Sequence, residues 1–253
     1  MADPLTRMLQ IARFFADLVL PDTCVLCRLP QQVPNAPSAS HFDDHLCPYC
    51  RAAVALNSNP CTYCAVPLPT AQTVCGRCVS APLVDAATVP ILHQHCGAHL
   101  ISRLKFHNGA REAHALCGFM LAAIKQRYCG ANPLPDCLVP VPIARSTMLR
   151  RGYNQAYWLA RPLQHQLDIP VVVAAHRPRR GPSQRALTRN QRLSLPANTF
   201  RLRSHAKIQR LLFQSHVAIV DDVLTTGSTV STLAATLRRA GVRRIDVWAA
   251  TRA

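Results

Sequence analysis

The chain has 253 residues, of which 49% are hydrophobic, so it can bury one large core or two modest ones. Its formal net charge of +17 favours polyanionic partners, either nucleic acid or small substrates that carry several phosphates, although an arginine-rich proteome would also explain it. No run of about 18 uncharged apolar residues occurs, so no membrane span is expected.

Residues 1–21 are expected to form an amphipathic helix that docks on the body of the protein. Their apolar side chains recur at helical spacing, at Leu5, Met8, Leu9, Ala12, Phe15 and Val19. Arg13 and Asp17 interrupt the apolar run, and no basic segment precedes it, so a secretory signal peptide is not indicated. A surface membrane helix would normally carry more Lys and Arg. We therefore expect a cytoplasmic protein.

Eight of the twelve cysteines form four CxxC pairs within residues 22–82, which we expect to be a separate small domain. They are Cys24, Cys27, Cys47, Cys50, Cys61, Cys64, Cys75 and Cys78. In a reducing compartment such pairs indicate metal ligation rather than disulfides, because two thiolates separated by two residues can face one ion from a tight turn. Consecutive pairing gives one site from the first four cysteines and one from the last four. Interleaved pairing is the alternative.

Tetrahedral sets of thiolates suit zinc, with iron as the minor alternative. Each set leaves no open position for a substrate, so two structural Zn²⁺ sites are expected. The segment is rich in Pro, Ser, Asn and Gln and is not expected to fold without metal. His41 and His45 are alternative ligands, but the cysteine sets are already complete. The pattern therefore predicts a double zinc ribbon.

Residues 83–253 are expected to form a domain of the α/β class with a doubly wound parallel sheet. Strand patterns occur at 83–92, 137–143, 170–174, 217–220 and 244–250, and helical patterns occur at 97–107, 110–128, 154–167 and 228–239. Residues 176–216 have a mostly irregular, basic sequence. In such sheets, ligands bind at the carboxyl ends of the strands.

Residues 217–229, which read VAIVDDVLTTGST, combine a buried strand, two carboxylates and a Thr/Gly/Ser turn at a helix start. Backbone N–H groups and hydroxyls of the turn, with the positive helix end, form a nest for a monophosphate. Gly227 lets the backbone approach phosphate oxygens closely. Asp221 and Asp222 can accept hydrogen bonds from vicinal ribose hydroxyls. The alternative is a strand–turn–helix with a capping hydroxyl and solvated aspartates. The sequence lacks the Walker and dinucleotide-binding motifs.

This segment resembles the 5-phosphoribosyl-1-pyrophosphate (PRPP) motif of type I phosphoribosyltransferases. Three more blocks resemble those of the ComF competence-protein family: LISRLKFHNG (100–109), LVPVPIARSTMLRRGYNQAYWLA (138–160) and QRALTRNQRLSLPANTF (184–200). That family, which includes proteins named for gluconate metabolism and for DNA utilisation, joins a double zinc ribbon to a phosphoribosyltransferase-like domain. The resemblance covers nearly the whole chain.

The resemblance implies that Asp221 and Asp222 are the catalytic carboxylates, which hold the ribose hydroxyls of PRPP, and that Mg²⁺ accompanies this ligand. The expected phosphate-binding segment comprises Val223, Leu224, Thr225, Thr226, Gly227, Ser228 and Thr229. Arg145 follows a PVP turn that is placed like the pyrophosphate-binding loop. Arg150 and Arg151 are suited to clamp pyrophosphate oxygens, unless they belong to an exposed basic turn. Lys105 has the sequence context of a solvated lysine at a helix end.

Residues 177–203 carry eight arginines and no acidic residue. In type I phosphoribosyltransferases a flexible loop in this region closes over PRPP, which assigns pyrophosphate or loop contacts to Arg185, Arg189 and Arg192. Binding of nucleic-acid phosphates is the competing interpretation. Nearby aromatic residues suit either stacking on bases or core packing, and they are Tyr153, Tyr157, Trp158 and Phe200.

Three functions fit these patterns. The first is pentosyl transfer, in which a nucleophile displaces pyrophosphate from PRPP bound with Mg²⁺. The second is a non-catalytic, zinc-dependent module that binds single-stranded DNA during natural transformation, with proteins of the DNA-uptake machinery as further partners. The third is regulation, with PRPP or a nucleotide sensed rather than consumed.

Overall fold

The structure is a computed structural model that describes residues 23–30, 45–69, 72–106, 109–130, 132–178 and 199–253. The helix expected over residues 1–21 lies outside the described residues. Within the described ranges, no helix has both the length and the apolar character that a membrane span requires.

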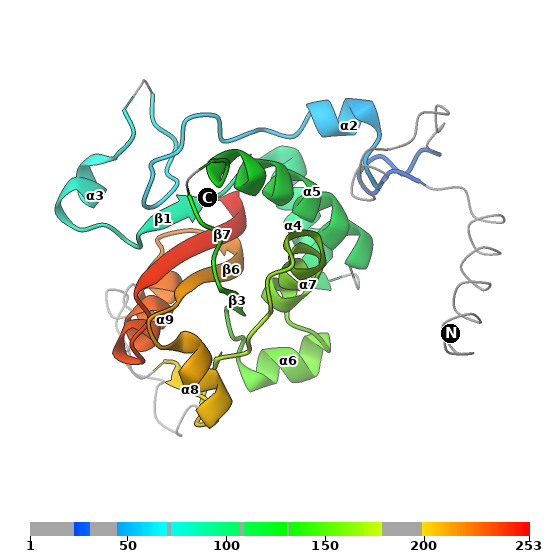
Figure 1. Ribbon diagram of the computed structural model, residues 1–253. Helices are drawn as coiled ribbons and strands as arrows, with labels where there is room; N and C mark the ends of the chain where they lie inside the picture. Colours follow the sequence, from blue (N-terminus) through cyan, green and yellow to red (C-terminus); the bar gives the residue numbers. More distant parts are fainter. Residues whose placement is uncertain (1–22, 31–44, 70–71, 107–108, 131, 179–198) are drawn as a thin grey trace, which may run out of the picture.

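A parallel sheet occupies the centre of the fold (Figure 1). Its strands are β1 (Ala86–Thr88), β2 (Ile91–Leu92), β3 (Cys137–Pro140), β6 (His216–Leu224) and β7 (Arg244–Arg252). The spatial order is β1–β7–β6–β3, and β2 continues along the edge of β7 that β1 begins. A parallel bridge between Leu138 and Val171 extends the sheet beyond β3. Because the strands run parallel, their carboxyl ends meet at one edge, where ligands bind in α/β folds.

Side chains of the two central strands alternate between two buried cores, one on each face of the sheet. In β6, Ala218 and Val220 belong to one core, whereas Val217 and Ile219 belong to the other. In β7, Trp248 faces the first core. A strand that is buried on both faces needs a continuous apolar sequence, which is what β6 has before its acidic pair. The expected doubly wound α/β class is therefore what the structure shows.

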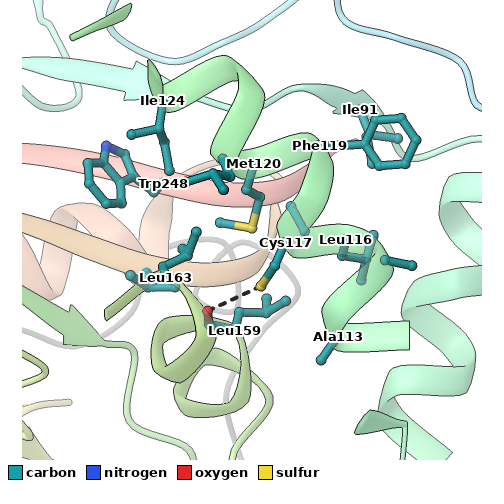
Figure 2. Packing of buried hydrophobic residues seen from close by; sticks show 14 of the residues in the cluster. Ile91, Ala113, Leu116, Cys117, Phe119, Met120, Ile124, Leu159, Leu163 and Trp248 are labelled. Atoms are coloured by element: carbon teal, nitrogen blue, oxygen red, sulfur yellow. Dashed lines mark hydrogen bonds between the residues drawn. The ribbon is translucent and has the colours of Figure 1, made fainter. Parts of the chain in front are cut away.

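Three long helices cover the first face, namely α4 (His95–Phe106), α5 (Ala110–Arg127) and α7 (Gln155–Leu167). Figure 2 shows how α5 places Met120 and Ile124 against Trp248 of β7. On the side of α5 that meets α7, the buried Cys117 thiol donates to the Leu159 carbonyl at 3.3 Å (Figure 2). The unpaired cysteine thus behaves as a small core side chain.

The second face is covered by α8 (Ala206–Leu212) and α9 (Ser228–Arg239), both of which contribute to its core. Helix α9 buries Val230, Leu233 and Leu237 at helical spacing. Near the carboxyl ends of the strands lie α6 (Arg145–Arg151) and an antiparallel hairpin made of β4 (Ala175–His176) and β5 (Arg201–Leu202).

Most predicted elements are present, whereas α6 and the β4–β5 pair were not predicted and three further segments differ from the prediction. Residues 170–174 form only one bridge, because the Ala174 amide donates to the Val172 carbonyl and turns the chain. Residues 206–212, expected to be irregular, form α8. Strand β6 extends to Leu224, so both aspartates lie within the strand rather than after it.

A buried polar network closes the opposite, amino-terminal end of the sheet. The fully buried Asp246 carboxylate contacts His216 Nε2 at 2.8 Å, accepts from the Tyr128 hydroxyl at 2.5 Å and accepts from Arg244 Nε at 3.2 Å. Burial alone would raise the pKa of Asp246, but these partners outweigh it and lower the pKa below its ordinary value. This network therefore holds its charge and stabilises the sheet far from the carboxyl-end site.

Candidate functional site

The structure brings the eight paired cysteines together as two clusters of consecutive pairs. One cluster joins Cys24, Cys27, Cys47 and Cys50, and the other joins Cys61, Cys64, Cys75 and Cys78. In both clusters the second knuckle leads into a short helix, α2 (Pro48–Ala52) or α3 (Gly76–Ser80). Consecutive pairing is thereby confirmed and interleaved pairing is wrong.

The geometry of both clusters fits zinc. Within each cluster the four sulfur atoms all lie within 4.8 Å of one another. The Cys27 and Cys47 Sγ atoms are 3.8 Å apart, and the Cys64 and Cys75 Sγ atoms are 3.6 Å apart. A tetrahedral ion with Zn–S bonds of about 2.3 Å separates its ligands by roughly 3.8 Å. The Cys75 amide also donates to Cys61 Sγ at 3.3 Å, which helps that sulfur to carry negative charge.

The pKa values of the clustered thiols indicate that a bound cation is needed to keep all four ionised. Burial raises the pKa of Cys24, but backbone amides, led by that of Cys47, reverse this effect and lower the pKa to about 6. In the second cluster, burial and then the neighbouring cysteines raise the pKa of Cys64 to about 12. Four such thiols become thiolates together only when a divalent cation offsets their repulsion. The two groups therefore fit two structural zinc sites.

The acidic pair lies on the last part of β6, at the carboxyl edge of the sheet. The Asp222 amide donates to Asp221 Oδ1 and the Val223 amide donates to Asp222 Oδ1, both at 2.9 Å. Burial, followed by repulsion from Asp222, raises the pKa of Asp221 well above its ordinary value. Two adjacent carboxylates held in this way cost stability, which is typical of a functional site.

Lys105, near the end of α4, supplies the counter-charge for this pair. Its Nζ atom lies 2.8 Å from Asp222 Oδ2, and the two side chains are 27% and 15% exposed. The expectation of a solvated lysine is therefore wrong, because the fold brings α4 over the carboxyl end of β6. His93 lies nearby: burial, then the Lys105 charge, lower its pKa, and its Nδ1 is 3.0 Å from the Thr251 hydroxyl.

The turn after β6 has the features of a phosphate nest. Thr225 and Thr226 are exposed, whereas Gly227 is buried with a φ of +82°. The Thr226 hydroxyl donates to Ser228 Oγ at 3.2 Å and accepts from the Ser228 amide at 3.4 Å. Helix α9 starts at Ser228, so the positive end of the helix points to the turn. Within the predicted segment of residues 223–229, Thr225 and Thr226 are thus the exposed residues, close in sequence to the acidic pair.

The described arginines predicted to bind pyrophosphate lie along two cavities. Arg150 and Arg151 line a cavity of about 380 Å³ together with Lys105, which is the lysine that contacts the acidic pair. Arg145 lines a larger cavity of about 1190 Å³ at the end of β3. Arg185, Arg189 and Arg192 lie outside the described residues.

Two arginines of this edge were not found by sequence reasoning. Arg252, on β7, donates from Nη1 to the Leu224 carbonyl at 3.0 Å, at the start of the turn. Arg77, between two zinc-ligating cysteines, donates from Nη1 to the Thr226 carbonyl at 3.4 Å. Both contacts join residues more than twenty positions apart, so no local sequence pattern predicts them.

Proteins similar to this chain bear two names. DNA utilization protein YhgH of Salmonella typhi is 33% identical over 243 residues, which are 91% of this chain and 97% of that protein. YhgH of Escherichia coli K12 is 32% identical with the same coverage. Competence protein F of Haemophilus influenzae is 32% identical over 196 residues, 76% of this chain and 84% of that protein.

The other comparisons add little. A solved structure titled as the allosteric regulatory enzyme of purine biosynthesis aligns with a TM-score of 0.37 and 16% identity, over 59% of this chain and 30% of that chain. No model of a protein family matches the chain. The YhgH relatives, however, match 91% of this chain at 31–33% identity. The chain therefore belongs to the ComF family, and its two paired cysteine clusters and parallel sheet agree with the expected double zinc ribbon followed by an α/β domain.

Proposed function

We propose that this protein binds PRPP with Mg²⁺ at the carboxyl edge of β6 and that it acts in DNA uptake or utilisation. The names of the relatives support the second part of the proposal. The observation that supports the first part is that an acidic pair, a lysine and a Thr/Gly/Ser turn lie together at the carboxyl end of β6.

Each part of PRPP has matching groups at this edge. The turn of residues 225–229 offers backbone N–H groups, hydroxyls and a helix end to the 5-phosphate. Asp221 and Asp222 accept from the ribose hydroxyls, and the high pKa of Asp221 means that a cation there is favoured. Arg150 and Arg151, in the cavity beside Lys105, face the place that the pyrophosphate would take. Mg²⁺ would be held mainly by oxygens of the ligand, as is usual for this ion.

Calorimetry of the zinc-loaded protein tests this proposal. We expect PRPP with Mg²⁺ to bind with a Kd in the micromolar range, about −8 kcal/mol. Binding should weaken at least tenfold when Mg²⁺ is left out of the buffer. Ribose 5-phosphate should bind more weakly, because it lacks pyrophosphate. An absence of heat with all of these ligands, from a protein that carries its zinc, would overturn the proposal.

A second function, binding of single-stranded DNA, is favoured by the larger cavity. Its described lining combines aromatic side chains, including Tyr157 and Trp158, with the cations Arg145, Arg177 and Arg203. None of the described residues that line it is acidic. Tyr153 stacks on Trp158 with ring centroids 4.6 Å apart, which presents a flat aromatic surface. Basic grooves with aromatic platforms are how proteins hold single strands without sequence preference.

Fluorescence anisotropy with a labelled oligothymidine tests the second function. The Tyr157→Ala substitution should weaken binding about tenfold, which is the usual contribution of one stacked base. Tyr49→Ala is the matched control, because Tyr49 is 87% exposed on α2. Affinity should also fall steeply between 50 and 200 mM salt. Equal affinities for the two variants, or no response to salt, would exclude the groove as a strand-binding site.

A further inference from the structure

The second ribbon, defined as residues 61–78, is joined by hydrogen bonds to the edge of the sheet that carries the site. The Ala87 amide of β1 donates to the Thr62 carbonyl at 2.7 Å. Arg252 of β7 donates from Nε to the Cys64 carbonyl at 3.1 Å. The second ribbon is therefore hydrogen-bonded to β1 and β7, and β7 pairs along its length with β6, which presents the acidic pair and the turn.

Arg252 connects this ribbon directly to the phosphate turn. Its side chain is buried, with 9% of the residue exposed, and one guanidinium reaches both the Cys64 carbonyl and the Leu224 carbonyl. Leu224 is the last residue of β6, immediately before the turn. A planar guanidinium fixes the relative position of two acceptors better than a flexible ammonium group does. Arg252 therefore fixes the position of the start of the turn relative to the Cys61–Cys64 knuckle.

The middle of the turn rests on the other knuckle. Arg77, between Cys75 and Cys78, donates to the Thr226 carbonyl at 3.4 Å. Leu83 lies under Gly227, and a Cβ atom at that glycine would come within 2.6 Å of Leu83 Cδ2. Leu83 packs against both the ribbon core and the second core of the sheet. The Cys61–Cys64 knuckle thus contacts the start of the turn through Arg252, and the Cys75–Cys78 knuckle contacts its middle through Arg77.

Arg77 is exposed, so besides contacting the turn its guanidinium is accessible to a ligand. A guanidinium carries five N–H donors, and the contact with Thr226 uses one of them. A phosphate seated on the amides of the turn would lie beside the remaining donors, since the Thr226 carbonyl belongs to the same turn. Guanidinium–phosphate contacts are charge-assisted and among the stronger hydrogen bonds in proteins.

We propose that the second zinc ribbon is part of the phosphate site: Arg77 binds the phosphomonoester of the ligand, and the zinc-held knuckles position the turn. This inference rests on the proposed function, because it takes a ribose 5-phosphate group as the ligand. It assigns unequal roles to two clusters with the same ligands, since Arg77 and Arg252 link only the second cluster to the turn among the described contacts.

Ribose 5-phosphate titrations of point variants test the role of Arg77. The Arg77→Ala substitution should raise the Kd about tenfold, and Arg77→Lys should recover part of this loss. Arg28→Ala is the matched control, because Arg28 is an exposed arginine next to a knuckle of the first cluster. Wild-type affinity in Arg77→Ala, with binding by the unmutated protein established, would overturn the contact.

Hydrogen exchange tests the positioning role without any ligand, so it separates this inference from the proposed function. Cys75→Ser plus Cys78→Ser should speed exchange of the amides of residues 225–231, whereas Cys24→Ser plus Cys27→Ser should leave them unchanged. Arg252→Lys, which keeps the cysteines, should loosen the same amides and guards against general unfolding of the ribbon variant. Unchanged protection of the turn in both the second-cluster variant and Arg252→Lys would overturn the inference, even if PRPP binds.

Discussion

Removal of metal is expected to have the largest effect on this protein. The native chain should carry about two zinc ions. A chelator of high affinity should remove both ions, and the ribbons should then unfold. Structural zinc in small domains contributes about 10 kcal/mol or more of apparent binding free energy. These Pro- and Ser-rich segments have little apolar core, so burial of side chains cannot replace that contribution. Elemental analysis and melting temperature measure the two effects.

Cysteine variants divide this effect between the two sites. Cys61→Ser plus Cys64→Ser should reduce the zinc content to about one ion per chain, because a tetrahedral site does not survive the loss of two thiolates. Cys117→Ser is the control: its thiol is buried in the core, so the substitution lowers stability while both ions stay bound. A zinc content near zero in the freshly purified native protein would contradict the assignment of the clusters.

The second large effect is expected from Asp221→Asn combined with Asp222→Asn. This double variant should lose at least a hundredfold of affinity for PRPP, about 2.7 kcal/mol, since two carboxyl groups that face the ribose hydroxyls and the cation become amides. It should also melt at a higher temperature than the native protein at neutral pH. Loss of binding with gain of stability is the pattern that a functional carboxylate pair predicts.

The pH dependence follows from the raised pKa of Asp221. The folded state holds this proton more tightly than the unfolded chain does, so native stability falls as pH rises from about 3.9 towards the folded-state pKa. The stability advantage of Asp221→Asn over the native protein should therefore be absent near pH 4 and grow as the pH rises. Thermal melts of the variant and of the native protein from pH 4 to 8 measure this difference.

Local patterns explain what the sequence predicted well. The CxxC spacing places two thiols on one turn whatever surrounds them, so it predicted the clusters. The start of α9 at Ser228 was predictable because Val230, Leu233 and Leu237 recur at helical spacing directly after a glycine turn. The apolar run of β6 likewise predicted a buried strand, although not how far the strand continues past its aspartates.

Contacts between distant parts of the chain explain what the sequence did not predict. Lys105 and Asp222 are 117 positions apart, and only the packing of α4 over the sheet brings them to 2.8 Å. Arg77 was one of many arginines until the fold placed it at Thr226. Residues 170–174 have the composition of a strand, yet a local turn at Val172 leaves a single bridge. Such outcomes depend on three-dimensional partners, which periodicity does not record.

The distribution of the four unpaired cysteines has a practical consequence for spectroscopy. Cys117 and Cys137 are buried, and burial raises the pKa of the Cys137 thiol to about 12, so neither should react with a maleimide in the folded state. Zinc protects the eight clustered thiols. Cys96 is half-buried, whereas Cys129 is exposed just beyond α5, so Cys129 is the favoured attachment point for a fluorophore in the native chain. A dye at that position would sit next to Tyr128, at the amino-terminal end of the sheet, and would leave the carboxyl-end site free without any engineered cysteine.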